Sequence, residues 1–214
     1  SGADAGDEFI EVWNPTDTVI DISGWSIQYV SGSASAISSS TVSRKNFTNG
    51  AAVPARGFFL VARSLNSSGA DGYGGSVAAD MGHRSFSLSA AAAGAKVFVV
   101  SNQNDIDSLN DPDVVDFIDY SSQVPGSGES LERKAYTNSA CVDPTGMGEF
   151  LGNGCDTDAN TDFVLRPNPK PQNTSSLPEP RQALAAVTDL TGAYVADNLR
   201  IDLTCGESSG VVGL

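Results

Sequence analysis

Short runs of strand-forming residues, each closed by turn residues, constrain this chain of 214 residues more than any other feature. The runs are rich in Val, Ile, Phe, Trp and Tyr and are bounded by Gly, Asn, Asp, Pro or Ser, as β-strands joined by turns are. The alanine run at residues 90–93 stops at Gly94 and is far shorter than the roughly 12–15 residues that an isolated helix needs. The sequence therefore predicts an all-β fold, an antiparallel β-sandwich. We predict strands at residues 8–13, 19–22, 25–29, 57–62, 95–100 and 114–120, with a weaker one at 130–136.

Two of these runs differ in the way they are expected to be buried. Residues 25–29 alternate between apolar and polar side chains, which indicates a strand with one buried face. Residues 57–62 are almost continuously apolar, which indicates a strand that is covered on both faces.

A proline-rich segment marks the end of the predicted sandwich. Four prolines lie between Asn168 and Pro180, and such a segment is an extended exit from a domain. An all-β sandwich of about this length forms one domain. We therefore assign residues 1–180 to the sandwich and residues 181–214 to a C-terminal tail.

The tail contains a strictly alternating stretch. One face consists of Leu199, Ile201, Leu203 and Cys205, and the intervening side chains are polar. This pattern predicts one strand over about residues 194–205, which extends the sandwich at its C-terminal end. We expect it to act as an assembly strand on the open sheet edge of a neighbouring molecule, or else to fold back onto its own sheet.

Charge and cysteine usage indicate the compartment and exclude some partners. The formal net charge of −14 and the absence of any basic patch exclude nucleic acid as a partner, since that binding needs clustered cations. No apolar run approaches the roughly 20 residues of a spanning helix, so membrane insertion is excluded too. A disulfide between Cys141 and Cys155 is expected to close a loop rich in Gly and Asp, which implies a secreted, extracellular protein. Three unpaired thiols are the alternative.

Several segments, read together, resemble the lamin-tail domain family in its bacterial, secreted form. The first strand ends at Asn14-Pro15, and residues 21–25 (Asp-Ile-Ser-Gly-Trp) are similar to the family's Asp-Leu-Ser-Gly-Trp turn. Further likeness lies in residues 59–62, 116–120, 125–133, 156–163 and 169–173, so that the resemblance spans about residues 7–176. It implies an immunoglobulin-like β-sandwich that acts as an interaction module and has no catalytic residues.

Three residues of the resembling segments have roles that follow from their side chains alone. Gly24 precedes a strand and is expected to take a positive φ, which glycine adopts at little cost. Trp25 is expected to fill the space between the two sheets, and Trp13 is expected to be a core residue as well.

One acidic loop has the spacing of a cation site. Asp156, Asp158, Asn160 and Asp162 place oxygen atoms at every second position, as in the first half of a calcium-binding loop. The match is incomplete, because Thr161 stands where such a loop needs glycine. Calcium is the one cofactor that the sequence suggests, and a solvated acidic loop is the alternative.

The sequence favours a protein that is not an enzyme. A histidine-dependent triad would have to use His83, the one histidine of the chain, and no nucleophile-elbow motif is present. A pair of carboxylates in a glycosidase remains an alternative that no residue singles out.

We therefore expect an extracellular structural module that assembles with copies of itself into a filament or surface layer. The alternatives are a monomeric binding or adhesion module that contacts another extracellular protein, and an accessory domain of a secreted hydrolase.

Overall fold

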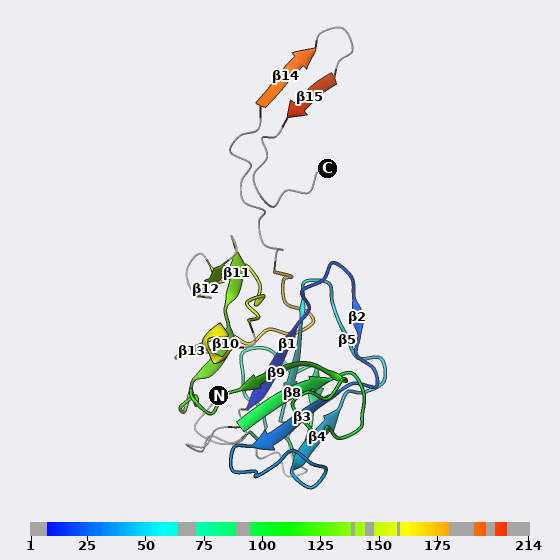
Figure 1. Cartoon of the computed structure of the whole chain (residues 1–214), viewed down its shortest axis with the longest axis vertical. Helices are drawn as coiled ribbons and strands as arrows, with labels where there is room; N and C mark the ends of the chain where they lie inside the picture. Colours follow the sequence, from blue (N-terminus) through cyan, green and yellow to red (C-terminus); the bar gives the residue numbers. More distant parts are fainter. Residues whose placement is uncertain are drawn as a thin grey trace.

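The computed structural model describes residues 8–63, 72–88, 95–137, 140–143, 148–157, 159–179, 191–195 and 200–204. The regular secondary structure of these residues is almost entirely β-strand, in agreement with the predicted fold class (Figure 1). None of them forms a helix with the length and apolar character needed to cross a membrane. The strands are β1 (Phe9–Trp13), β2 (Ile20–Asp21), β3 (Ser26–Ser31), β4 (Val42–Asn46), β5 (Ala52–Val53), β6 (Phe58–Ala62), β7 (Met81–Gly82), β8 (Ala95–Val100), β9 (Val114–Asp119), β10 (Ser130–Arg133), β11 (Ala135–Thr137), β12 (Ala140–Val142), β13 (Phe163–Arg166), β14 (Thr191–Val195) and β15 (Arg200–Thr204).

Two main sheets form the sandwich. One is antiparallel with strand order β4-β3-β8-β9, and the other has the order β1-β6-β7, in which β7 runs parallel to β6. Side chains from both sheets meet in one apolar cluster, which includes Ile27 of β3, Phe59 and Val61 of β6, and Val97 of β8. The sandwich interior therefore lies between these two sheets.

A second apolar cluster covers the opposite face of the four-stranded sheet. Val30, Phe98 and Val100 pack there with Ile106 from the loop between β8 and β9. The ring of Phe98 stacks on that of Phe117, with centroids 5.6 Å apart. This sheet is therefore covered on both faces, although only one face contacts the other sheet.

The predicted burial of two strands is confirmed in one case and only partly in the other. All five residues of β6 are buried, as its continuous apolar run predicted. In β3, however, Ser26 and Gln28 are buried together with Ile27. The side chains of these polar residues donate hydrogen bonds to the main-chain oxygens of Asn102 (2.7 Å) and Asn104 (2.6 Å), so the loop after β8 covers the polar face of β3.

Asn14 explains why β1 ends where it does. Its side chain is 2% exposed, and its amide nitrogen donates to the carbonyl oxygens of Thr18 (2.8 Å) and Pro54 (2.9 Å). Its side-chain oxygen accepts hydrogen bonds from the main chain and hydroxyl of Thr16. Because Pro15 cannot continue a hydrogen-bonded strand, the chain turns here, and Asn14 ties the turn to the β5–β6 connection.

The Gly24 turn has the predicted backbone conformation. Gly24 has a φ of +82°, and no atom lies within 4 Å of the place that a Cβ would occupy there, so its conformation rather than crowding favours glycine. Trp25 packs against the main core, as expected. Trp13 is only partly buried and lies outside both clusters, where its ring covers the backbone of Gly152.

The C-terminal region departs from the predicted single strand. Two strands, β14 and β15, pair antiparallel with each other and form a separate two-stranded sheet. The alternating pattern marked only the second strand, because β14 contains Gly192 and Ala193 and has no clear periodicity. The boundary predicted near residue 180 falls outside the described residues.

Candidate functional site

The region after β9 contains most of the candidate functional residues. β10 pairs with β13, and β11 pairs with β12, in two small sheets. A loop of residues 148–157 and the short 3-10 helix η2 (Asn160–Asp162) connect these strands. Residues 167–179, here called the exit segment, follow β13.

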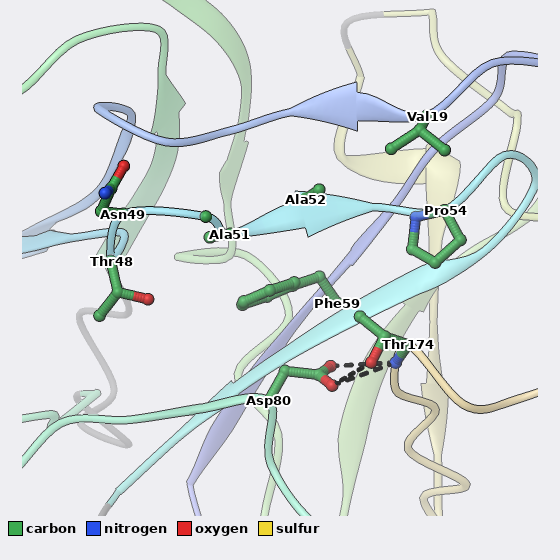
Figure 2. Close-up of a pocket in the computed structure, with 10 residues that line it drawn as sticks. Val19, Thr48, Asn49, Ala51, Ala52, Pro54, Phe59, Asp80 and Thr174 are labelled. Carbon is green, nitrogen blue, oxygen red and sulfur yellow. Dashed lines mark hydrogen bonds between the residues drawn. The ribbon is translucent and has the colours of Figure 1, made fainter.

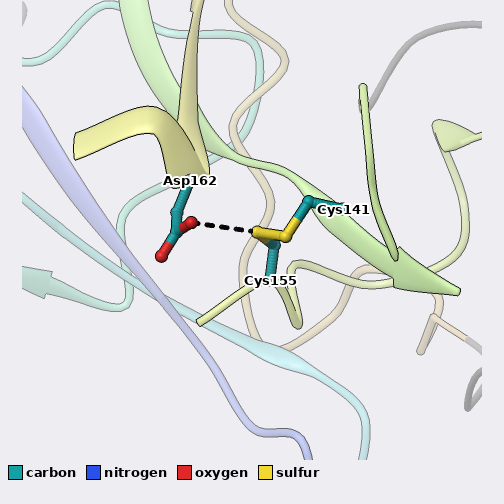
Figure 3. A group of neighbouring side chains, drawn as sticks. All are labelled: Cys141, Cys155 and Asp162. Carbon is teal, nitrogen blue, oxygen red and sulfur yellow. Dashed lines mark hydrogen bonds between the residues drawn. A yellow bond between two sulfur atoms is a disulfide. The ribbon is translucent and has the colours of Figure 1, made fainter. Parts of the chain in front are cut away.

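The predicted disulfide between Cys141 and Cys155 is present (Figure 3). It joins β12 to the loop before η2, and Cys155 is completely buried. The carboxylate of Asp162 points toward this bond, with Oδ1 3.3 Å from Sγ of Cys155. Since a disulfide sulfur carries no hydrogen, this approach is a sulfur–oxygen contact and does not satisfy the carboxylate.

Asp162 is instead satisfied by its own loop. Its carboxylate accepts hydrogen bonds from the main chain (2.6 Å) and hydroxyl (2.7 Å) of Thr157 and lies 3.4 Å from the main-chain nitrogen of Ala159. Burial by itself raises the pKa of Asp162, but these donors outweigh it, and the net effect is a lowered pKa. Asp162 therefore acts as an ionised anchor that shapes the loop.

Two of the other predicted calcium ligands, Asp156 and Asn160, have partners elsewhere. The carboxylate of Asp156 pairs with Arg133 at 3.1 Å, and the side-chain amide of Asn160 donates to the hydroxyl of Ser122. Asp158 lies outside the described residues. A calcium ion in this loop would have to compete with Arg133 for Asp156 and with backbone donors for Asp162. Calcium binding therefore stays a prediction that these contacts do not favour.

Arg133 is the centre of an ion-pair network that sequence reasoning missed. Its guanidinium donates to both carboxylate oxygens of Asp116 at 2.7 Å and to the main-chain oxygen of Cys155 at 3.0 Å. It also lies over the ring of Phe163, 4.6 Å from the centroid. Arg133 thereby joins β9, β10, β13 and the disulfide loop, and a planar five-donor group suits such a junction.

A cluster of partly or fully buried carboxyl groups lies on the other side of the small β10–β13 sheet. Glu11 of β1 and Glu179 of the exit segment belong to it, together with Glu132 of β10. Glu132 forms an ion pair with Arg166 at 2.8 Å. Burial raises the pKa of Glu11 to about 8, and the neighbouring negative charges of Glu132 and Glu179 add to this shift.

Sequence reasoning had no signal for this cluster. Glu11 and Glu179 are 168 residues apart in sequence, and Glu11 sits in an apolar strand where an alternating polar residue is expected to be solvated. Gln172 of the exit segment donates a main-chain hydrogen bond to Glu11, so the cluster exists only in the folded chain.

A shallow groove of about 460 Å³ lies between β5 and the exit segment (Figure 2). Phe59 of β6 forms part of its lining, and the exposed side chain of Val19 stands at its rim. Asp80 closes one side, where it accepts hydrogen bonds from the main chain and hydroxyl of Thr174. The carboxylate of Asp80 is therefore engaged in holding the exit segment.

His83 has the surroundings of a structural residue. Its Nδ1 lies 3.2 Å from the hydroxyl of Ser85 in the same turn. Burial lowers the pKa of His83, and the positive charge of Lys45 lowers it further. The side-chain hydrogen bonds described for His83 are those with Ser85 of the same turn.

The predicted assembly strand is described in part. Ile201 and Leu203 lie in β15, and Leu199 and Cys205 lie outside the described residues.

Comparison of the chain with protein-family models, with curated proteins and with solved structures returns no match.

Proposed function

We propose that this protein is a non-enzymatic extracellular module of the lamin-tail type that assembles with copies of itself through its C-terminal hairpin. The observation that carries the proposal is the pairing of β14 with β15 in a sheet of their own. A two-stranded hairpin is at best marginally stable in water, and it needs a third strand or a packed face. A second copy of the chain supplies the third strand through its strand edge and the packed face through its side chains.

Other features support parts of this proposal. The Cys141–Cys155 disulfide fits an oxidising, extracytoplasmic environment. The Asn14-Pro15 turn and the Gly24-Trp25 turn, on which the resemblance to the lamin-tail family rests, both have the backbone role expected from the sequence. The immunoglobulin-like arrangement of the strands remains part of the proposal.

The test is the particle size of the full chain, of a chain that ends at Pro180, and of the full chain with Ile201→Pro. Proline removes a strand hydrogen bond and prevents pairing along β15. We expect the full chain to form polymers in light scattering and electron microscopy, and both altered chains to stay monomeric. A matched control is Ser208→Pro, which places the same residue outside β15. Polymers that form equally well with Ile201→Pro would overturn the proposal.

Each sample is measured with calcium and with a chelator, because the acidic loop at residues 156–162 was the predicted cation site. Circular dichroism checks that the shortened chain keeps its β-structure.

The groove beside β5 favours a second candidate, a monomeric binding module. Its lining combines an apolar floor at Phe59 with the polar side chains of Thr48 and Asn49. Monomers of the full chain in every condition would favour this candidate over assembly.

A further inference from the structure

The exit segment is held onto the sandwich by carboxyl groups at three points. Glu11 of β1 accepts a hydrogen bond from the main chain of Gln172, and Asp80 accepts hydrogen bonds from Thr174. Glu179, which is 5% exposed, accepts a 2.7 Å hydrogen bond from the main chain of Gly152. These contacts lie immediately before the chain enters the tail.

The charged groups of the cluster around Glu11 come from β10, β13, the loop at residues 148–157 and the exit segment, whereas β6, which pairs with β1, contributes none. The carboxyl groups are Glu132 of β10, Glu149 of the loop at 148–157, and Glu179 of the exit segment. The cations are Arg166 of β13, which pairs with Glu132, and Lys170 of the exit segment, which pairs with Glu149. Among these residues each cation already has an acidic partner, and Glu11 has only the Gln172 main-chain donor.

This arrangement gives Glu11 two different states. In both states Glu11 accepts the Gln172 hydrogen bond, which favours the ionised form, but burial raises the pKa of Glu11 by more than this bond lowers it. A neutral Glu11 adds no charge to the cluster. An ionised Glu11 places a negative charge in a partly buried site that it shares with Glu132 and Glu179. Because Glu179 is part of the exit segment, displacement of that segment both separates like charges and exposes Glu11 to water.

We propose that the exit segment is a pH-sensitive clasp, which is closed while Glu11 is protonated and opens when Glu11 loses its proton. Alkaline conditions then release the segment that leads to the C-terminal hairpin. The consequence for assembly rests on the function proposed above, but the clasp itself does not.

The direction of the effect follows from linkage. The pKa of Glu11 is about 8 in the closed state and is expected near its ordinary value of 4.5 in the open state. The proton on Glu11 therefore favours the closed state fully at any pH below 4.5. The preference is lost as the pH rises toward 8, and the opening equilibrium grows by up to tenfold per pH unit in that interval.

The test is hydrogen exchange of the full chain at several pH values between 6 and 9, with exchange times scaled for the base-catalysed intrinsic rate. We expect protection of the peptide that covers residues 170–179 to fall at least about tenfold across this range. In Glu11→Gln, which keeps a neutral acceptor for Gln172, protection is expected to stay constant. Glu179→Gln removes a like charge next to Glu11 and is expected to weaken the pH response.

The matched control is Glu8→Gln. Glu8 lies next to β1, and it accepts a 2.7 Å hydrogen bond from the main chain of Leu88, outside the exit segment. In this variant the exit segment is expected to lose protection with the same pH dependence as in the unmodified chain. Equal protection of the unmodified chain at pH 6 and pH 9, or an equal pH response in Glu11→Gln, would overturn the clasp.

Particle size at the same pH values separates the two proposals. Opening of the exit segment in a chain that stays monomeric supports the clasp and contradicts assembly. Polymers at every pH with constant protection support assembly and contradict the clasp.

Discussion

The sandwich interior and the region after β9 are stabilised in different ways. The interior is built from apolar side chains such as Phe59 and Val97, which both main sheets contribute. The later region contains a disulfide, the Arg133 network and most of the carboxyl cluster around Glu11, and few of its described residues are fully buried apolar groups. Apolar burial depends little on pH, whereas carboxyl groups respond to it directly. The two parts of one chain should therefore differ in what unfolds them.

The largest expected effect is in the interior. Phe59 of β6 is buried and packs in the apolar cluster between the two sheets, so Phe59→Ala should lower the free energy of unfolding by about 3–5 kcal/mol, as lost burial and a cavity combine. Urea unfolding at pH 6 and pH 9 measures this. Val115→Ala is the control, since Val115 is 54% exposed and its truncation should cost little. A loss that differed strongly between the two pH values would contradict the comparison.

The disulfide should come next. Cys141 and Cys155 are 14 residues apart, and closure of a loop of this size contributes about 3 kcal/mol in the chain-entropy model. The double substitution of both cysteines by Ser should lower the urea midpoint accordingly. Cys205→Ser controls for the loss of a cysteine in general. If reduction of the unmodified chain left its stability unchanged, the disulfide would not be the main support of this region.

The third prediction concerns pH. Glu11, Glu132 and Glu179 all have raised pKa values, first because of burial, so the folded state binds protons more tightly than the unfolded chain. Their contribution is complete below pH 4.5 and is lost as the pH rises toward about 8. We expect a loss on the order of 2 kcal/mol between pH 5 and pH 9, and Glu11→Gln should remove most of it. Urea titrations of both proteins across that range decide this, and parallel curves would contradict it.

The smallest expected effect is at the surface of the four-stranded sheet. Lys96 of β8 and Asp119 of β9 pair across the strands at 2.9 Å, and both side chains are about a quarter exposed. Such pairs contribute about 0.2–1 kcal/mol because water screens them and the side chains lose freedom. Lys96→Met should therefore change stability by less than about 1 kcal/mol. Repeating the measurement in about 1 M salt should reduce the difference, and an undiminished one would indicate packing instead.

Local signals in the sequence correctly located much of the fold. The runs at β1, β3, β6, β8 and β9 were predicted because the period of two and the bounding turn residues are properties of consecutive residues. The short strands β5, β7 and β12 were missed, since two or three residues carry no periodicity. The strand β13 was missed as well, since Phe163 was interpreted only as the end of the acidic segment 156–163 and residues 164–166 were not recognised as a strand.

The features of the candidate sites also fall into two groups, those that local residue order predicts and those that only the folded chain shows. The all-β class, the Gly24 turn and the Cys141–Cys155 pairing were predictable from the residue order, because backbone preferences and a short loop closure act between residues that are close in the chain. Three other roles emerged only in the folded chain: Asp162 anchors its loop, Arg133 joins four elements, and Glu11 lies beneath the exit segment. These roles depend on burial and on charges from distant segments, and a linear pattern of residue types contains neither.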